Sequence, residues 1–392
     1  MKTERLKSSL NELLASAQIS INGKNPWDII VNNDEFYSKV FSSGSLGAGE
    51  AYVEKLWDCK QLDEFFTRVL ESNIDKKIKT NWKLVTEIFL AKIFNKQTKA
   101  LAFDNGQKHY DLGNDIFINM LDKRMTYTCG YWKNAANLEE AQEHKLDMTC
   151  RKLNLHSGMK VLDIGCGWGS FAKFAVEKYS VHVTGITVSE QQIELGRKMC
   201  AGMPIELKLM DYRDLSEKFD AIVSIGMFEH VGYKNYRKYM QIVHKCLKDE
   251  GLFLLHTIGN STSLTSTDPW MNKYIFPGSM LPSIQQIGKA IDGLFVLEDC
   301  HNFGADYDKT LVAWHNNFVA NWDNLKDKYD EKFFRMWKYY LLMCAGAFRA
   351  RKNQLWQMVF SKNGVPGGII LYDRKSVFAL NEDVVKLFYD YT

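Results

Sequence analysis

The chain has 392 residues, of which 46% are hydrophobic and 25% are charged. This length and composition supply enough apolar side chains for a folded core, and they exclude disordered, collagen-like and disulfide-framework proteins. Lys and Arg number 50 against 47 Asp and Glu. The resulting formal net charge of +3 is too small to indicate a nucleic-acid-binding protein.

The eight cysteines are scattered and include no C-x-x-C pair, so we predict neither a metal site nor a redox dithiol. Reduced thiols in a cytoplasmic protein fit this pattern best. The start, MKTERLKSSL, lacks the apolar core of a secretory signal, and no run reaches the roughly 18 apolar residues that span a bilayer. We therefore expect any contact with a membrane to be made from its surface.

Residues 1 to about 100 are predicted to form a small, mainly helical domain. Leu6, Leu10 and Leu13 recur at helical spacing, and residues 27–31 form a β-prone apolar run. The glycine-rich motif GSLGAGE (44–50) interrupts the helical stretches that follow.

The last part of this region, residues 75–99, carries seven lysines against two acidic residues, interleaved with aromatic and aliphatic side chains. This pattern predicts a basic amphipathic helix. Such a helix could lie on an anionic membrane surface, or it could be an ordinary core helix with a solvated lysine face.

From about residue 160, β-branched apolar runs alternate with helical stretches, which is typical of a parallel sheet with crossover helices. Five such runs lie at 160–165, 181–187, 205–210, 219–226 and 251–259. Two later runs, at 294–300 and 355–362, are expected to complete the sheet after a helical stretch over 310–351. The carboxyl ends of the parallel strands would then share one rim, where open α/β sheets bind ligands.

The first of these strands leads into a glycine-rich loop, VLDIGCGWG (161–169), that opens a helix. Glycines there let the backbone turn sharply and approach a ligand, and the helix N-terminus offers free N–H groups. The spacing is not the G-x-G-x-x-G of dinucleotide enzymes, and Thr187 stands where a ribose-binding acid would be expected, so NAD is disfavoured. The loop instead resembles that of class I S-adenosylmethionine-dependent methyltransferases.

Four further motifs are QKHYDLGND (107–115), MTYTCGYW (125–132), SIGMFEHVG (224–232) and FGADYD (303–308). Together with the loop they resemble the cyclopropane fatty-acyl-phospholipid synthases, and the resemblance covers the whole chain. The related mycolic acid cyclopropane synthases are similar only in the catalytic half. The resemblance implies an α/β, Rossmann-like methyltransferase domain with a seven-stranded sheet over residues 101–392. It also implies a helical lipid- or membrane-binding domain over residues 1–100.

The implied reaction transfers a methylene group from S-adenosylmethionine to the cis double bond of an acyl chain in a membrane phospholipid. A bound bicarbonate would be the base that removes a proton to close the ring. The resemblance assigns its binding to five residues: Cys129, Glu229, His256, Ile258 and Tyr307. Because an anion beside a carboxylate requires a proton on one of them or an intervening histidinium, we expect Glu229 and His256 to titrate together.

Residue-by-residue matching also assigns the cofactor contacts. Nine residues are expected to contact S-adenosylmethionine: Tyr127, Thr128, Gly165 and Gly167 at the methionine part, Asp163 at the ammonium group, Thr187 and Gln192 at the ribose, and Asp211 and Tyr212 at the adenine. The insert at 259–293 is expected to line or cover the acyl tunnel. The family further implies a homodimer that associates peripherally with the inner face of the cell membrane.

Each site residue also has a structural interpretation when taken singly. Cys129 could be a small buried apolar side chain, Glu229 a helix cap, His256 a core histidine and Tyr307 a packed aromatic. Two of them nevertheless follow the carboxyl ends of predicted parallel strands, which favours a site. The other functional hypotheses are acyl-chain methylation without ring closure, N-methylation of a small amine, and a non-catalytic peripheral membrane protein.

Overall fold

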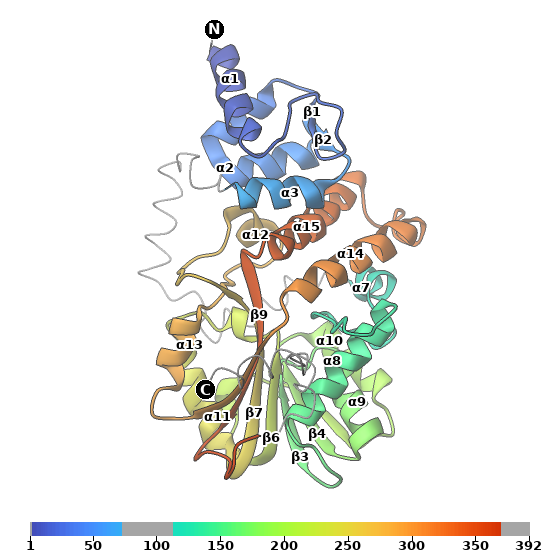
Figure 1. Cartoon of the computed structure of the whole chain (residues 1–392). Helices are drawn as coiled ribbons and strands as arrows, with labels where there is room; N and C mark the ends of the chain where they lie inside the picture. The colour runs from blue at the N-terminus through green and yellow to red at the C-terminus, as the bar shows by residue number, and fades with distance from the viewer. Residues whose placement is uncertain (1, 73–112, 370–392) are drawn as a thin grey trace, which may run out of the picture.

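The computed structural model describes residues 2–72 and 113–369 (Figure 1). The predicted basic helix over 75–99 lies outside these ranges, as do the predicted domain boundary near residue 100 and residues 107–112 of the first motif.

A seven-stranded sheet with helices on both faces confirms the predicted α/β fold (Figure 1). Its strand order is β5-β4-β3-β6-β7-β9-β8. The strands are β3 (Lys160–Ile164), β4 (His182–Thr187), β5 (Ile205–Leu209), β6 (Phe219–Ile225), β7 (Leu247–Asn260), β8 (Val296–Asn302) and β9 (Asn353–Ser361). The first five in the spatial order are parallel, whereas β9 is antiparallel to both of its neighbours. The order reverses at β3, so a ligand is expected at its carboxyl end.

Some helices of this part cover the two faces of the sheet, and others lie between the sheet and the N-terminal helices (Figure 1). They are α7 (Asn114–Met120), α8 (Leu138–Lys152), α9 (Ser170–Tyr179), α10 (Glu190–Met199), α11 (Tyr236–Cys246), α12 (Pro269–Tyr274), α13 (Ile284–Ile291), α14 (Ala305–Ala320) and α15 (Glu331–Arg349). Helices α8 and α9 lie on one face of the sheet, and α11 and α13 lie on the other (Figure 1). Their apolar side chains pack against the strands. Both faces of the central strands are therefore buried, which explains their nearly continuous apolar sequences.

Residues 2–72 form helices and a small antiparallel sheet. The elements are α1 (Lys2–Ala15), β1 (Ile29–Val31), α2 (Glu35–Val53), β2 (Trp57–Cys59) and α3 (Leu62–Glu71). Within the glycine-rich motif, Gly44 has a φ of +55° and kinks α2, as the sequence predicts. Strand β2 is not predicted from the sequence because three residues are too few to show a period.

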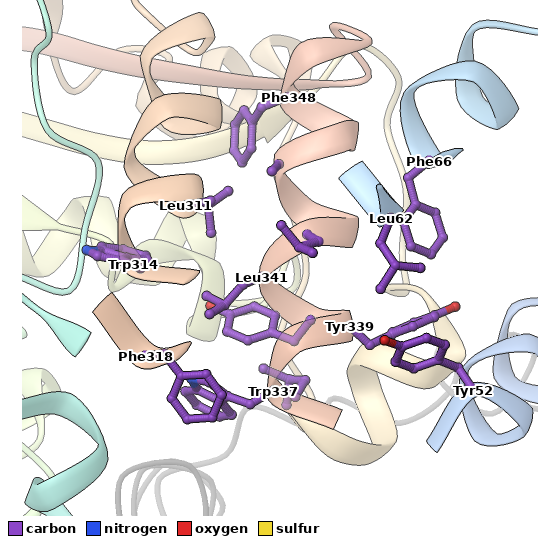
Figure 2. Packing of buried hydrophobic residues seen from close by; sticks show 14 of the residues in the cluster. Tyr52, Leu62, Phe66, Leu311, Trp314, Phe318, Trp337, Tyr339, Leu341 and Phe348 are labelled. Atoms are coloured by element: carbon purple, nitrogen blue, oxygen red, sulfur yellow. The ribbon is translucent and has the colours of Figure 1, made fainter. Parts of the chain in front are cut away.

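Helix α15 joins the N-terminal helices to the rest of the molecule (Figure 2). On one side it faces Leu311, Trp314 and Phe318 of α14, and on the other it faces Tyr52, Leu62 and Phe66. Gly346 allows the close approach of α3, because a Cβ there would lie 2.6 Å from the Asp63 carbonyl oxygen. One apolar core therefore runs from the N-terminal helices to the aromatic side chains that border the sheet.

Candidate active site

A cavity of about 170 Å³ lies at the carboxyl ends of β3, β4, β5 and β6. All nine residues expected to contact the cofactor line it: Tyr127, Thr128, Asp163, Gly165, Gly167, Thr187, Gln192, Asp211 and Tyr212. These residues come from segments up to 85 positions apart in the chain, between Tyr127 and Tyr212. The strand order brings them together at the reversal beside β3.

The glycine loop is shaped by backbone geometry that other residues rarely adopt. Gly165 has a φ of +86°, and a Cβ there would lie 2.6 Å from the Cβ of Met227. The N–H groups of Gly165 and Cys166 both donate to the Ile186 carbonyl, which ties the loop to β4. These hydrogen bonds fix the turn of the loop, and Gly167 leaves space beside the Gln192 amide nitrogen.

The polar side chains expected at the ribose and at the adenine already have protein partners. The Thr187 hydroxyl donates to Gln192 Oε1 at 2.9 Å, so the amide nitrogen of Gln192 remains the group available to a ligand. Both carboxylate oxygens of Asp211 accept from the Arg213 guanidinium at 2.8 Å. Arg213 also lines the cavity and is a site residue that the sequence analysis did not identify.

A fully buried lysine is the second site residue that the sequence analysis missed. Lys145 of α8 lines the cavity and donates from Nζ to Thr128 Oγ1 at 2.8 Å. Burial lowers its pKa to about 8, against the opposing effects of Asp122, Cys129 and Asp163. Burial likewise raises the pKa of Asp163 to about 7, and Lys145 opposes that shift. The cavity therefore has a titratable cation and carboxyl group in its wall.

The segment that carries Cys129 is held by hydrogen bonds from both sides. The Gln142 amide donates to the Thr128 carbonyl at 2.7 Å, and the Gly130 N–H donates to Thr310 Oγ1 at 3.1 Å. Cys129 itself is fully buried, with Sγ 3.8 Å from the same Thr310 oxygen. Burial raises the pKa of the Cys129 thiol well above its usual value, so it is a neutral S–H group.

Glu229, Ile258 and His256 meet where β6 and β7 end. The Ile258 N–H donates to Glu229 Oε1 at 2.6 Å, and the Gly226 N–H donates to the His256 carbonyl at 2.9 Å. The backbone donor of Ile258 thus holds Glu229. Tyr307, in the first turns of α14, is close enough to Cys129 and Glu229 to interact with both electrostatically.

Burial sets the protonation states of these groups. It raises the pKa of Glu229 to about 7, against the stabilising N–H of Ile258, and it lowers the pKa of His256 well below its usual value. Burial also raises the pKa of Tyr307 well above 10. Glu229 Oε2 and His256 Nε2 are buried and have no hydrogen-bond partner among the described residues. Burial therefore favours a protonated Glu229 and a neutral His256.

Aromatic side chains border the cavity on the side of α15. The hydroxyl groups of Tyr127 and Tyr340 are hydrogen-bonded at 2.8 Å, and the ring of Phe276 lies 5.8 Å from that of Tyr340. Phe276 also contacts the ring of His230, which lines the cavity. Phe276 belongs to the predicted insert, which reaches the site again where the Met280 N–H donates to the Glu229 carbonyl.

The described residues contain no group of His, Cys, Asp and Glu side chains that could hold a metal ion. Within the same residues, no helix is long and apolar enough to cross a bilayer.

Comparisons with known proteins agree with this arrangement. Residues 97–358 match the family model described as mycolic acid cyclopropane synthetase. The chain is 52% identical over 359 residues to the cyclopropane-fatty-acyl-phospholipid synthase of Escherichia coli K12, covering 92% of this chain and 94% of that protein.

Solved structures give the same result for the part that contains the sheet. The cyclopropane synthase MmaA2 from Mycobacterium tuberculosis superposes with a TM-score of 0.63 at 31% identity, covering 66% of this chain and 98% of that one. The mycolic acid cyclopropane synthase CmaA1, complexed with SAH and CTAB, gives a TM-score of 0.62 at 33% identity with the same coverage. The chain therefore belongs to the cyclopropane synthase family of S-adenosylmethionine-dependent methyltransferases.

Proposed function

We propose that this enzyme transfers a methylene group from S-adenosylmethionine to the cis double bond of an unsaturated acyl chain in a membrane phospholipid, with bicarbonate as the base. The observation that carries the proposal is the pair of buried, unpartnered atoms Glu229 Oε2 and His256 Nε2, beside a methyl-donor cavity and an aromatic wall. A related protein of 52% identity is named as a synthase acting on fatty-acyl phospholipids.

The cavity residues fit the cofactor chemically. Gly165 and Gly167 leave room for the methionine part of the cofactor, and Asp163 supplies a carboxyl group for its ammonium group. The Gln192 amide nitrogen faces the loop. When bound, S-adenosylmethionine would supply an electrophilic methyl group on a sulfonium. The protein's task is to hold an alkene in line with that group and to exclude water.

The groups around Cys129 fit a small oxyanion. Cys129, Tyr307 and a protonated Glu229 are neutral hydrogen-bond donors in a site shielded from water. Bound among them, bicarbonate would supply the base for the proton lost on ring closure. The Ile258 N–H orients Glu229 and completes the set of five residues.

The aromatic wall suits the acyl chain and the positive charge that develops on it. Tyr127, Tyr340 and Phe276 present apolar faces beside the cavity. Desolvated aromatic rings attract a cation by about 2 kcal/mol, so they would stabilise a carbocation where water would trap it. A plain apolar pocket would bind the chain without this effect.

The proposal includes a membrane encounter, since phospholipid acyl chains lie in bilayers. We assign lipid binding to residues 1–100 and peripheral association to the inner face of the cell membrane, and we expect a homodimer. Co-sedimentation with vesicles of an anionic phospholipid and light scattering of the free protein test these parts. A monomer that stays in the supernatant would contradict them.

The central test is incubation with S-adenosylmethionine and vesicles of a phosphatidylglycerol that carries one cis-unsaturated chain. Mass spectrometry should show the addition of one CH₂ to that chain together with loss of its alkene reactivity, and a fully saturated lipid should remain unchanged. Glu229→Ala should abolish turnover while S-adenosylhomocysteine still binds. Methylation that leaves a double bond, or modification of an added amine with unaltered lipid, would refute ring formation.

A further inference from the structure

A chain of hydrogen bonds connects the His256 ring to β9 and α8. The Thr149 hydroxyl donates to the Lys145 carbonyl in the preceding turn of α8 at 2.8 Å. Gln357 Nε2 on β9 lies 3.0 Å from Thr149 Oγ1 and 3.3 Å from His256 Nδ1. Thr149 and Gln357 are fully buried and His256 is 1% exposed, so water does not compete for these contacts.

The number of available hydrogens fixes the direction of each bond. Thr149 has one hydroxyl hydrogen, which it gives to the Lys145 carbonyl, so its oxygen must accept from Gln357. The atom of Gln357 at that contact is therefore the amide nitrogen, which can only donate. Because the same nitrogen contacts His256 Nδ1, that ring atom must accept. Burial keeps the ring neutral, and its single proton then lies on Nε2.

The reversed amide is less favourable. Turning Gln357 by 180° would place Oε1 between Thr149 and His256, and the Thr149 hydroxyl would have to abandon the Lys145 carbonyl to donate to it. Both amide hydrogens would then point to the position where Oε1 now has no partner. Two buried donors without acceptors cost more than one buried acceptor without a donor.

We propose that Gln357 and Thr149 are positioning residues that fix His256 in the tautomer with its proton on Nε2, so that the ring presents an N–H donor to the bound oxyanion. The inference rests on the proposed function for the identity of the acceptor. His256 Nε2 is buried and has no hydrogen-bond partner among the described residues, as expected for a donor that awaits a ligand. The other tautomer would direct a lone pair at the anion and repel it.

Nitrogen-15 NMR of the full-length protein labelled at its nine histidines tests the inference, because protonated and bare ring nitrogens resonate far apart. The His256 signals are those lost in His256→Gln. We expect Nε2 to be protonated and Nδ1 bare in the wild type and in Thr149→Ser. Thr149→Val, which releases the amide, should populate the Nδ1–H form and lower turnover about tenfold or more. Gln357→Met removes the donor without altering α8 and should do the same.

The possible failures are distinct. Protonation of Nδ1 in the wild type, or an Nε2–H tautomer that persists unchanged in both Thr149→Val and Gln357→Met, would overturn the inference and leave the proposed function standing. A tautomer that shifts without any loss of turnover would overturn the catalytic role of His256 itself.

Discussion

Replacement of Glu229 by Gln should make the protein more stable than the wild type at alkaline pH. Glu229 is only 5% exposed, and burial raises the pKa of its carboxyl group from 4.5 to about 7. Gln has nearly the same shape and keeps the Oε1 atom that accepts from the Ile258 N–H. The substitution therefore removes the ionisable group and little else.

The sign and size of the effect follow from the two pKa values. Below pH 4.5 the carboxyl group is protonated in both the folded and the unfolded chain. Between pH 4.5 and about 7 the Glu229 carboxyl group ionises only in the unfolded chain. The wild type therefore loses about 1.4 kcal/mol of stability per pH unit relative to the variant. Above pH 7 the difference stays constant at about 3 kcal/mol. Glu229→Gln should thus exceed the wild type by less than about 1 kcal/mol at pH 5 and by about 3 kcal/mol at pH 8.5.

Urea denaturation followed by circular dichroism at these two pH values measures the difference. Glu194→Gln is the matched control, because Glu194 is exposed on α10 and its replacement removes one carboxyl group from the surface. A Glu229→Gln protein no more stable than the wild type at pH 8.5 would show that burial does not raise the pKa of this carboxyl group.

Three further substitutions test the cofactor site and the core. Lys145→Met should weaken S-adenosylhomocysteine binding tenfold or more in calorimetry, because it removes a charged hydrogen bond of about 1.5–3 kcal/mol that holds Thr128, an expected cofactor contact. Lys152→Met, on the same helix but paired with Asp299 of β8, should leave the affinity unchanged, and equal affinities of the two variants would contradict this. Gly165→Ala should lower both stability and cofactor affinity, because its Cβ has no room, while Gly158→Ala, at a similar φ in open space, should leave affinity unchanged. Trp270→Ala should lower the free energy of unfolding by about 3–5 kcal/mol in urea titrations, as expected for a fully buried aromatic, and a loss below 1 kcal/mol would be inconsistent with its burial.

The sheet and the cofactor cavity could be predicted from the sequence because their signals are local. Apolar runs separated by helical stretches identify the parallel strands, and the glycine loop after the first strand marks the reversal of strand order. Residues as distant as Tyr127 and Asp211 were assigned by resemblance to a family, and the structure places them around one cavity. Their individual contacts with a cofactor stay predictions.

The polar face of α8 could not be predicted, for a physical reason. Gln142, Lys145 and Thr149 recur at helical spacing, and a sequence pattern of this kind normally indicates a solvated face. Here this face of α8 is buried against the site, and each side chain has a partner outside the helix. Gln142 and Lys145 donate to Thr128, and Thr149 accepts from Gln357. Only tertiary contacts distinguish a buried polar stripe from an exposed one.

The proposed reaction depends most on a trapped oxyanion that accepts the proton lost from the added methyl group. The most direct measurement is the rate of ring formation in vesicles of a cis-unsaturated phospholipid, in buffer depleted of carbon dioxide and then supplemented with bicarbonate. We expect the rate to fall on depletion and to recover on addition in the wild type. A rate that does not depend on bicarbonate would contradict the role of bicarbonate as the base.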